Sequence, residues 1–288
     1  MCCSEWLLAV MALCVWAGNA HAVVLETNEW SNRTQAGWAY NAPPVIDNTT
    51  NTPAGGGALK MTYQPGTYST STGGGRAEFS GLSGTELYVG HWFKYSPDFV
   101  FNPFSTKIDY MWVNSNQIAT NSLAAFTIRE QNQGRLFAID VSIQGNGQLA
   151  SIPHTVYAAA NPRLQTNKWY WLEYHVRMND VIGTSGSLAD VVPNGVLEVW
   201  LDDVLQGSWS NLRWRDGANR TWKYFLHSPE WGGGGGTIPA TQYMWFDHTV
   251  ISTTRIGMPA TGVPETTCAV LLLLGIGGFF IGRKCHLS

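Results

Sequence analysis

The central part of the chain alternates between apolar and polar residues, which is the period of a β-strand that buries one of its two faces. The segment KWYWLEYHVRMN at 168–179 is the clearest case. Its apolar face carries Leu172, Tyr174, Val176 and Met178, and its other face carries Trp171, Glu173, His175 and Arg177. A slip of one residue would bury the polar face, so the pattern specifies the register of this strand.

The same alternation predicts further strands in the segments 86–96, 123–131, 135–144, 195–201 and 241–252. Asp202 and Asp203 are predicted to form a turn, from which the chain returns at Val204 as a hairpin. Long helical periodicity is absent between the two ends, and connectors rich in glycine, proline and asparagine separate the strands. Residues 23–252 are therefore predicted to form one all-β domain of two packed antiparallel sheets, followed by a linker at 253–262.

The first 22 residues have the pattern of a signal peptide. The apolar run WLLAVMALCVWAG is followed by NAHA, in which Ala20 and Ala22 have the spacing that signal peptidase recognises. We expect cleavage after Ala22 and export of the body of the protein.

The last 26 residues, 263–288, contain the sequence VPETT, an apolar stretch at 268–282 and then Arg283 and Lys284. This arrangement resembles the PEP-CTERM sorting signal of Gram-negative bacteria, although Thr266 stands where the motif has its second proline. The resemblance implies a membrane helix that an exosortase recognises and processes, and retention in the cell envelope or extracellular matrix. An ordinary C-terminal membrane anchor is the alternative.

Composition narrows the chemistry of the body. All five cysteines lie in the two terminal segments, so residues 23–262 contain no cysteine nucleophile and no cysteine zinc ligand. The formal charge is −3 and 13% of the residues are charged, which gives no electrostatic basis for binding nucleic acid. The 14 tryptophans indicate another kind of partner.

Several of these strands together resemble the jelly roll of the concanavalin A-like lectins and glucanases. The segments NKWYWLEYHVRMN, NGVLEVWLDD and MWFDHTVIS carry this resemblance, and GGGRAEFSGL and ELYVGHWFKYSPDF resemble parts of the polysaccharide lyases of that superfamily. The similarity covers most of residues 73–252. It implies a two-sheet jelly-roll sandwich in which the outward residues of one concave sheet line a groove for a sugar chain.

Residues that oppose the apolar face of their strands are the candidates for such a groove: Arg76, Glu78, Trp92, Lys94, Arg129, Gln131, Trp171, Glu173, His175 and Arg177. Tryptophan rings cover the apolar faces of sugars, while arginine, glutamine and glutamate hydrogen-bond hydroxyls and carboxylates. This mixture predicts an exported polysaccharide-binding protein whose ligand is acidic. A solvated sheet face with no ligand, as in a structural matrix protein, is an open alternative.

Catalysis would require a different set of groups. The Glu-x-Asp-x-x-Glu strand of the superfamily's glucanases is absent from the sequence, so we do not expect glycoside hydrolysis. Arg76 and Glu78 resemble the Arg-x-Glu strand of alginate-lyase-like enzymes. A polysaccharide lyase that acts on uronates by β-elimination is the alternative function, with His175 as the candidate base and Arg129 neutralising the carboxylate. The Gln-x-His strand of alginate lyases is not present, because TIREQNQ has the glutamine without the histidine.

Two further features of the sequence remain to be placed. Five glycines follow Trp231, which lies at the rim of the groove or packs in a structural loop against Trp245. His91, His154, His227 and His248 are isolated and none has zinc-ligand spacing, so no metal ligands are assigned. Asp247 is a candidate ligand for a structural calcium ion, as in some members of the superfamily, or a carboxylate that closes a loop.

Overall fold

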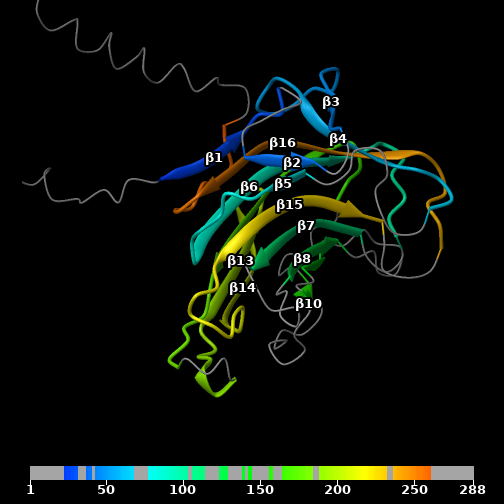
Figure 1. Cartoon of the computed structure of the whole chain (residues 1–288). Helices are drawn as coiled ribbons and strands as arrows, with labels where there is room; N and C mark the ends of the chain where they lie inside the picture. The colour runs from blue at the N-terminus through cyan, green and yellow to red at the C-terminus, as the bar shows by residue number, and fades with distance from the viewer. Residues whose placement is uncertain are drawn as a thin grey trace, which may run out of the picture.

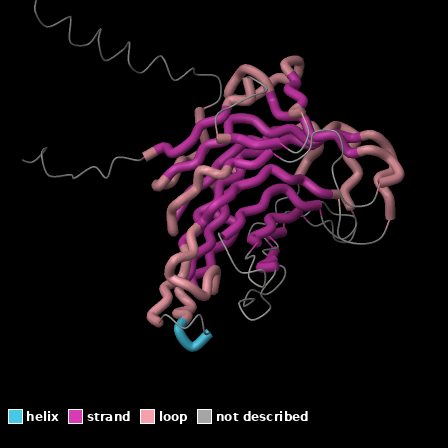
Figure 2. Tube along the Cα trace, viewed as in Figure 1, coloured by secondary structure: helices cyan, strands magenta, loops and turns pink. Residues whose placement is uncertain are grey.

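A computed structural model describes twelve stretches of the chain: 23–31, 37–40, 43–67, 77–102, 106–113, 123–128, 138–139, 142–144, 156–157, 164–183, 188–231 and 236–260. Nearly all of the regular structure in these stretches is β-strand, as predicted, with a single turn of 3-10 helix, η1, at Leu188–Asp190 (Figures 1 and 2). The signal peptide and sorting signal predicted at 1–22 and 263–288 lie outside the described residues.

The strands form two antiparallel sheets, which appear in Figure 1 as curved layers. Sheet A has the order β14-β13-β12-β6-β16-β4-β3, and β1 also pairs with β16. Its strands are β1 (Val24–Asn28), β3 (Val45–Asp47), β4 (Ala58–Tyr63), β6 (Glu86–Tyr95), β12 (Trp169–Arg177), β13 (Gly195–Leu201), β14 (Val204–Leu212) and β16 (Gln242–Ser252).

Sheet B has the order β10-β8-β7-β15-β5-β2. Its strands are β2 (Trp38–Tyr40), β5 (Ala77–Phe79), β7 (Thr106–Val113), β8 (Leu123–Ile128), β10 (Ser142–Gln144) and β15 (Trp222–Glu230). A separate two-stranded sheet pairs β9 (Ala138–Ile139) with β11 (Val156–Tyr157). The strands of sheet B come from distant parts of the sequence, so residues as far apart as Trp38 and Glu230 lie in the same sheet.

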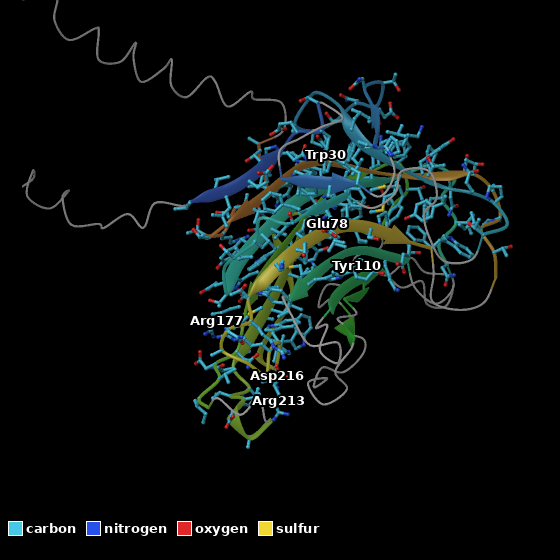
Figure 3. The ribbon with its side chains drawn as sticks, in the orientation of Figure 1. Trp30, Glu78, Tyr110, Arg177, Arg213 and Asp216 are labelled. Carbon is cyan, nitrogen blue, oxygen red and sulfur yellow. The ribbon has the colours of Figure 1, made fainter. Side chains whose placement is uncertain are left out.

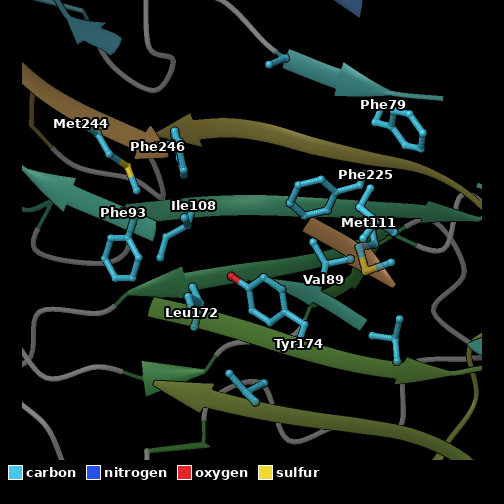
Figure 4. Close-up of a cluster of buried hydrophobic side chains, with 14 of the residues drawn as sticks. Phe79, Val89, Phe93, Ile108, Met111, Leu172, Tyr174, Phe225, Met244 and Phe246 are labelled. Carbon is cyan, nitrogen blue, oxygen red and sulfur yellow. The ribbon is translucent and has the colours of Figure 1, made fainter. Parts of the chain in front are cut away.

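The core lies between the two sheets and is built by the predicted alternation. Leu172, Tyr174 and Val176 of β12 are almost completely buried in it, whereas Trp171 and Glu173 lie on the opposite face of the strand. Figure 4 shows Val89, Phe93, Leu172, Tyr174, Met244 and Phe246 of sheet A together with Phe79, Ile108, Met111 and Phe225 of sheet B. Each large apolar side chain buried in this way contributes about 1.5–3 kcal/mol relative to an exposed one.

The hairpin between β13 and β14 has the predicted turn. Asp202 and Asp203 both adopt positive φ, at 50° and 63°, and Leu201 pairs directly with Val204. Two such residues in sequence form the turn that matches the twist of the flanking strands, and aspartate tolerates this conformation better than most residues. Asp202 Oδ1 also accepts a hydrogen bond from the Trp171 backbone N–H at 2.9 Å, which ties the turn to β12.

The outer face of sheet A is covered by two segments of the chain. Residues 253–258, here called the strap, follow β16, and the strap donates the N–H groups of Ile256 and Gly257 to the Glu173 carboxylate at 2.7 and 3.0 Å. Elsewhere on the same outer face, the loop at 47–54 accepts hydrogen bonds from the side chains of Trp245, Lys94 and Trp169. Much of this face is therefore buried although it opposes the core.

Candidate functional site

The outer face of sheet B carries a cluster of aromatic and apolar side chains. Tyr110 and Trp112 point outward from β7, and their direct cross-strand partners on β15 are Leu226 and Tyr224. The rings of Trp112 and Tyr224 meet edge to face with their centroids 6.0 Å apart. Tyr110 and Leu226 are buried, while Trp112 and Tyr224 are partly exposed. We call these four residues, with Lys107, Glu230, Lys223 and Glu78, the sheet B face.

Charged groups border the aromatic cluster. Lys107 of β7 lies directly opposite Glu230 of β15, and its Nζ is 2.7 Å from Glu230 Oε2. Lys107 also lies 5.6 Å from the centre of the Tyr110 ring, and Lys223 lies 5.4 Å from that of Tyr224. Cations over aromatic rings at these distances add modest attraction and keep the rings in place.

Tyr110 is held in its neutral form. Burial raises the pKa of its hydroxyl well above the ordinary value, and the negative charge of Glu230 raises it further. A phenol in this state donates a hydrogen bond and is a poor base. The sheet B face therefore combines aromatic rings, a hydroxyl donor and both signs of charge, which are the groups that bind sugars and their carboxylates.

The predicted site residues do not share one surface. Glu78 lies on the sheet B face, opposite Leu226, whereas Arg177 belongs to sheet A (Figure 3). The residues on the outer face of sheet A are Trp92, Lys94, Trp171, Glu173, His175 and Arg177. Arg76, Arg129 and Gln131 lie outside the described residues. The expectation that all of these residues line one groove is therefore wrong, because alternation gives the face of a strand and not the sheet to which it belongs.

His175, the candidate base, is enclosed by acidic partners. Its Nδ1 lies 2.8 Å from Glu198 Oε2, its Nε2 lies 2.9 Å from Glu86 Oε1, and its ring stacks on Tyr88 at 4.2 Å. Each ring nitrogen faces a carboxylate oxygen, so both contacts are hydrogen bonds only if both nitrogens carry protons. This geometry leaves no lone pair of His175 directed toward a substrate.

The other residues predicted on this face have structural contacts. Trp171 is fully buried beside Gly90 and Trp92, and Lys94 donates to Thr50 Oγ1 at 2.6 Å. Lys94 also lies between the rings of Trp169 and Trp245, at 4.9 and 4.8 Å, and burial lowers its pKa. Arg177 donates to the Asn194 carbonyl at 3.2 Å. These groups hold the loop at 47–54 and the ends of strands in position.

Trp231 also lies in the core. Its side chain is 3% exposed, and its indole N–H donates to the Val100 carbonyl at 2.6 Å. Asn102 Nδ2 donates to the Trp231 carbonyl at 3.0 Å. These contacts match the structural role for this tryptophan rather than a position where a sugar ring could stack.

Comparison with known proteins gives the fold. No protein-family model matches the chain, and no curated protein matches its sequence. The endo-β-1,4-glucuronan lyase of the fungus Trichoderma reesei superimposes with a TM-score of 0.55 at 16% identity, over 81% of this chain and 96% of that one. The alginate lyase Aly36B gives 0.53 at 12% identity, over 75% and 97% of the two chains. The chain is a two-sheet jelly-roll sandwich.

A third solved structure, whose name does not mention a lyase, is similar to the same degree. The cellulose-induced protein Cip1 superimposes with a TM-score of 0.52 at 15% identity, over 81% of this chain and all of that one. At identities this low the three likenesses establish the fold and do not transfer an activity.

The part of the chain that the structure describes contains no helix with the length and apolar character of a membrane span.

Asp247 is a buried carboxylate of β16 that contacts the loop after β3. Asp247 Oδ2 accepts a hydrogen bond from the Ala54 N–H at 3.3 Å, whereas Asp247 Oδ1 and Thr52 Oγ1 are buried with no hydrogen-bond partner. Burial, reinforced by the charge of Glu29, raises the pKa of Asp247 to about 7. Buried oxygens of this kind fit a calcium ion, which takes carboxylate, hydroxyl and carbonyl ligands.

A second polar cluster, not expected from the sequence, lies between the sheets. The possible metal-ligand atoms of three side chains, His91, Asp109 and His227, lie within 4.8 Å of one another. They come from β6, β7 and β15, so no short sequence motif links them. The sheet B face was also missed, because the aromatic residues of β7 and β15 alternate with equally apolar core residues.

Proposed function

We propose that this jelly roll binds an acidic polysaccharide across the sheet B face. The observation that carries the proposal is the partly exposed Trp112–Tyr224 pair, bordered by Lys223 and by the Lys107–Glu230 ion pair. Aromatic rings contact the apolar faces of sugar rings, and the lysines complement uronate carboxylates. Two of the superimposed jelly rolls are described as a glucuronan lyase and an alginate lyase, which supports a uronate polymer as the ligand.

The binding test compares two aromatic substitutions on the sheet B face with one on the other sheet. Trp112→Ala and Tyr224→Ala are each expected to weaken retention on glucuronan or alginate about tenfold in affinity electrophoresis, equal to about 1.4 kcal/mol. Tyr88→Ala removes a partly exposed ring from the outer face of sheet A and is expected to bind normally. Circular dichroism of each variant verifies the fold. Equal retention of all three variants, or none by the unmodified chain, would reject the proposal.

A polysaccharide lyase is the second candidate, and it is favoured by one specific contact. Tyr110, Glu230 and Lys107 lie together on the sheet B face, so a hydroxyl and a cation stand near one carboxylate. β-Elimination requires a cation near the uronate carboxylate, a base that accepts the proton on the neighbouring carbon and a proton donor at the leaving oxygen; Lys107, Glu230 and Tyr110 would take these three roles. Tyr110→Phe is expected to abolish release of unsaturated product from a polyuronate while the polymer still binds. Absence of any product from the unmodified chain leaves binding as the function.

We also propose that Asp247, Glu29 and the loop at 52–56 hold a structural calcium ion. The partnerless oxygens of Asp247 and Thr52 support this site, and bound calcium would supply positive charge to the buried carboxylates there. Glu29 lies beside the site, with its Oε1 2.6 Å from His248 Nδ1. The site would fasten the loop that covers part of the outer face of sheet A.

Calcium is expected to stabilise the chain by an amount that grows with the logarithm of its excess over the dissociation constant. A hundredfold excess corresponds to about 2.7 kcal/mol, which scanning calorimetry would detect as a higher Tm. Because folding raises the pKa of Asp247 from 3.8 to about 7, its contribution to stability without calcium is present below pH 3.8 and lost as pH rises through about 7. The gain from calcium is therefore expected to be greater at pH 8 than at pH 5. Asp247→Asn should abolish the calcium shift, and a shift that persists in this variant places the ion elsewhere.

Export and retention in the envelope complete the proposal. Signal peptidase acting after Ala22 would release the body, and an exosortase would process the segment at 263–288 while its apolar stretch lies in the membrane. Mass spectrometry of the mature protein from its native cell tests both cleavages. A mature chain that still contains the apolar stretch would favour an ordinary anchor.

A further inference from the structure

The centre of the sandwich contains a polar cluster inside an apolar shell. His91 Nε2 lies 2.7 Å from Asp109 Oδ2, and His227 Nδ1 lies 2.7 Å from Asp109 Oδ1. All three side chains are completely buried, and the rings of Phe225 and Phe246 pack against both histidines. Burying a carboxylate here is costly unless every polar atom has a suitable partner. The partner of each polar atom in the cluster therefore determines whether the buried carboxylate is stable there.

His91 faces an acceptor on each side. Beyond the Asp109 contact at Nε2, its Nδ1 lies 3.4 Å from the Trp92 carbonyl oxygen. A neutral imidazole has one N–H, so one of these two nitrogens directs a lone pair at an oxygen. A metal ion bound at Nε2 would leave the single N–H at Nδ1, facing the Trp92 carbonyl. The outer nitrogen of His227 faces the Thr249 hydroxyl at 2.8 Å.

We propose that His91, Asp109 and His227 form a structural zinc site that joins the two sheets. Two imidazole nitrogens and a carboxylate oxygen are a preferred ligand set for zinc. The Tyr174 hydroxyl, 2.9 Å from Asp109 Oδ2, would supply the fourth ligand. Tyr174 belongs to β12, and Figure 4 shows it among the buried side chains between the two sheets.

The surroundings of the two histidines suit ligation through these nitrogens. A zinc-bound histidine normally donates its remaining N–H to a carbonyl or hydroxyl oxygen, which fixes its tautomer. The Trp92 carbonyl would accept from His91 Nδ1, and Thr249 Oγ1 would accept from His227 Nε2. Each ligand therefore already has an outer partner of the right kind.

Zinc binding would require the three side chains to move. Ligands about 2.1 Å from a tetrahedral ion lie roughly 3.4 Å apart, so the two contacts of 2.7 Å would each open by about 0.7 Å, while the ligand atoms already lie within 4.8 Å of one another. Binding would displace the protons at His91 Nε2 and His227 Nδ1, the two ligating nitrogens, and leave each ring with one N–H at its other nitrogen. Because the cluster is completely buried, the ion would enter before the sandwich closes.

The test refolds the full chain from denaturant and chelator with Zn²⁺, with Co²⁺ or without metal, in calcium-free buffer. After desalting, atomic emission is expected to find one zinc per chain, and the cobalt form should show the visible absorption of a tetrahedral site. His91→Gln and His227→Gln should each reduce retained zinc at least tenfold. His175→Gln, on the outer face of sheet A and outside the cluster, should retain it.

Each alternative result overturns the proposal. A chain that folds equally well without metal and retains no zinc has a cluster held by hydrogen bonds alone. Zinc that remains in both core variants is bound elsewhere. If those variants fail to fold, the cobalt spectrum of the unmodified chain decides, since surface binding gives no tetrahedral absorption.

Discussion

Asp109→Ala is expected to lower the free energy of unfolding by about 3–5 kcal/mol, the usual result of removing one partner from a buried charged pair. The side chain of Asp109 is fully buried and accepts from His91, His227 and Tyr174. The alanine variant leaves those three groups without their acceptor inside the core and adds a cavity. Urea denaturation at constant pH and metal concentration measures the loss.

Asp109→Asn is the matched control for the loss of charge. Asparagine keeps the shape and one acceptor oxygen but places an NH₂ group where a second acceptor stood. Its cost should lie between those of the unmodified chain and the alanine variant. An alanine variant that loses less than about 1 kcal/mol would show that water enters the cluster and replaces the carboxylate.

Gly90→Ala is expected to cost about 1–3 kcal/mol, as over-packing of a filled site does. A Cβ on Gly90 would lie 2.3 Å from Trp171 Cζ2 and 2.9 Å from Cη2. Trp171 is fully buried between the sheet and the segments above it, so its ring has little room to move. Thermal unfolding followed by near-ultraviolet circular dichroism would report both the stability and the packing of the tryptophans.

Gly84→Ala provides the comparison for the same change at a permissive site. The nearest atom to a Cβ there is Leu87 Cδ2 at 3.4 Å, so this variant should differ little in stability. Combining Gly90→Ala with Trp171→Leu should cost less than the sum of the two single changes, because the smaller side chain makes room. Strict additivity would contradict the proposed clash.

The alternation of single strands predicted a large part of the fold. In the segment at 168–179, the residues expected in the core are in the core, and the turn expected at Asp202 and Asp203 has the required backbone. These features depend on neighbours in sequence, through the two-residue period and the turn preference of aspartate. The jelly-roll resemblance supplied the two-sheet arrangement.

The location of the candidate site depends on contacts that local patterns do not contain. The strap covers Glu173 although 80 residues separate them in sequence, so a residue predicted to face a groove is fully buried. His91 and His227 lie on strands of different sheets, yet their ring centroids are 4.8 Å apart and both side chains contact Asp109. The sheet B face was unrecognised because Tyr110 and Leu226 are as apolar as the core residues between which they alternate.

The strap also determines the side from which the chain leaves the sandwich. Arg255 Nη2 lies 3.1 Å from Asp203 Oδ1, and Met258 donates its backbone N–H to the same oxygen at 3.0 Å. The strap therefore lies against the outer face of sheet A, on the opposite side of the sandwich from the sheet B face. An attachment on that side would leave Trp112 and Tyr224 pointing toward polymer strands in the surroundings.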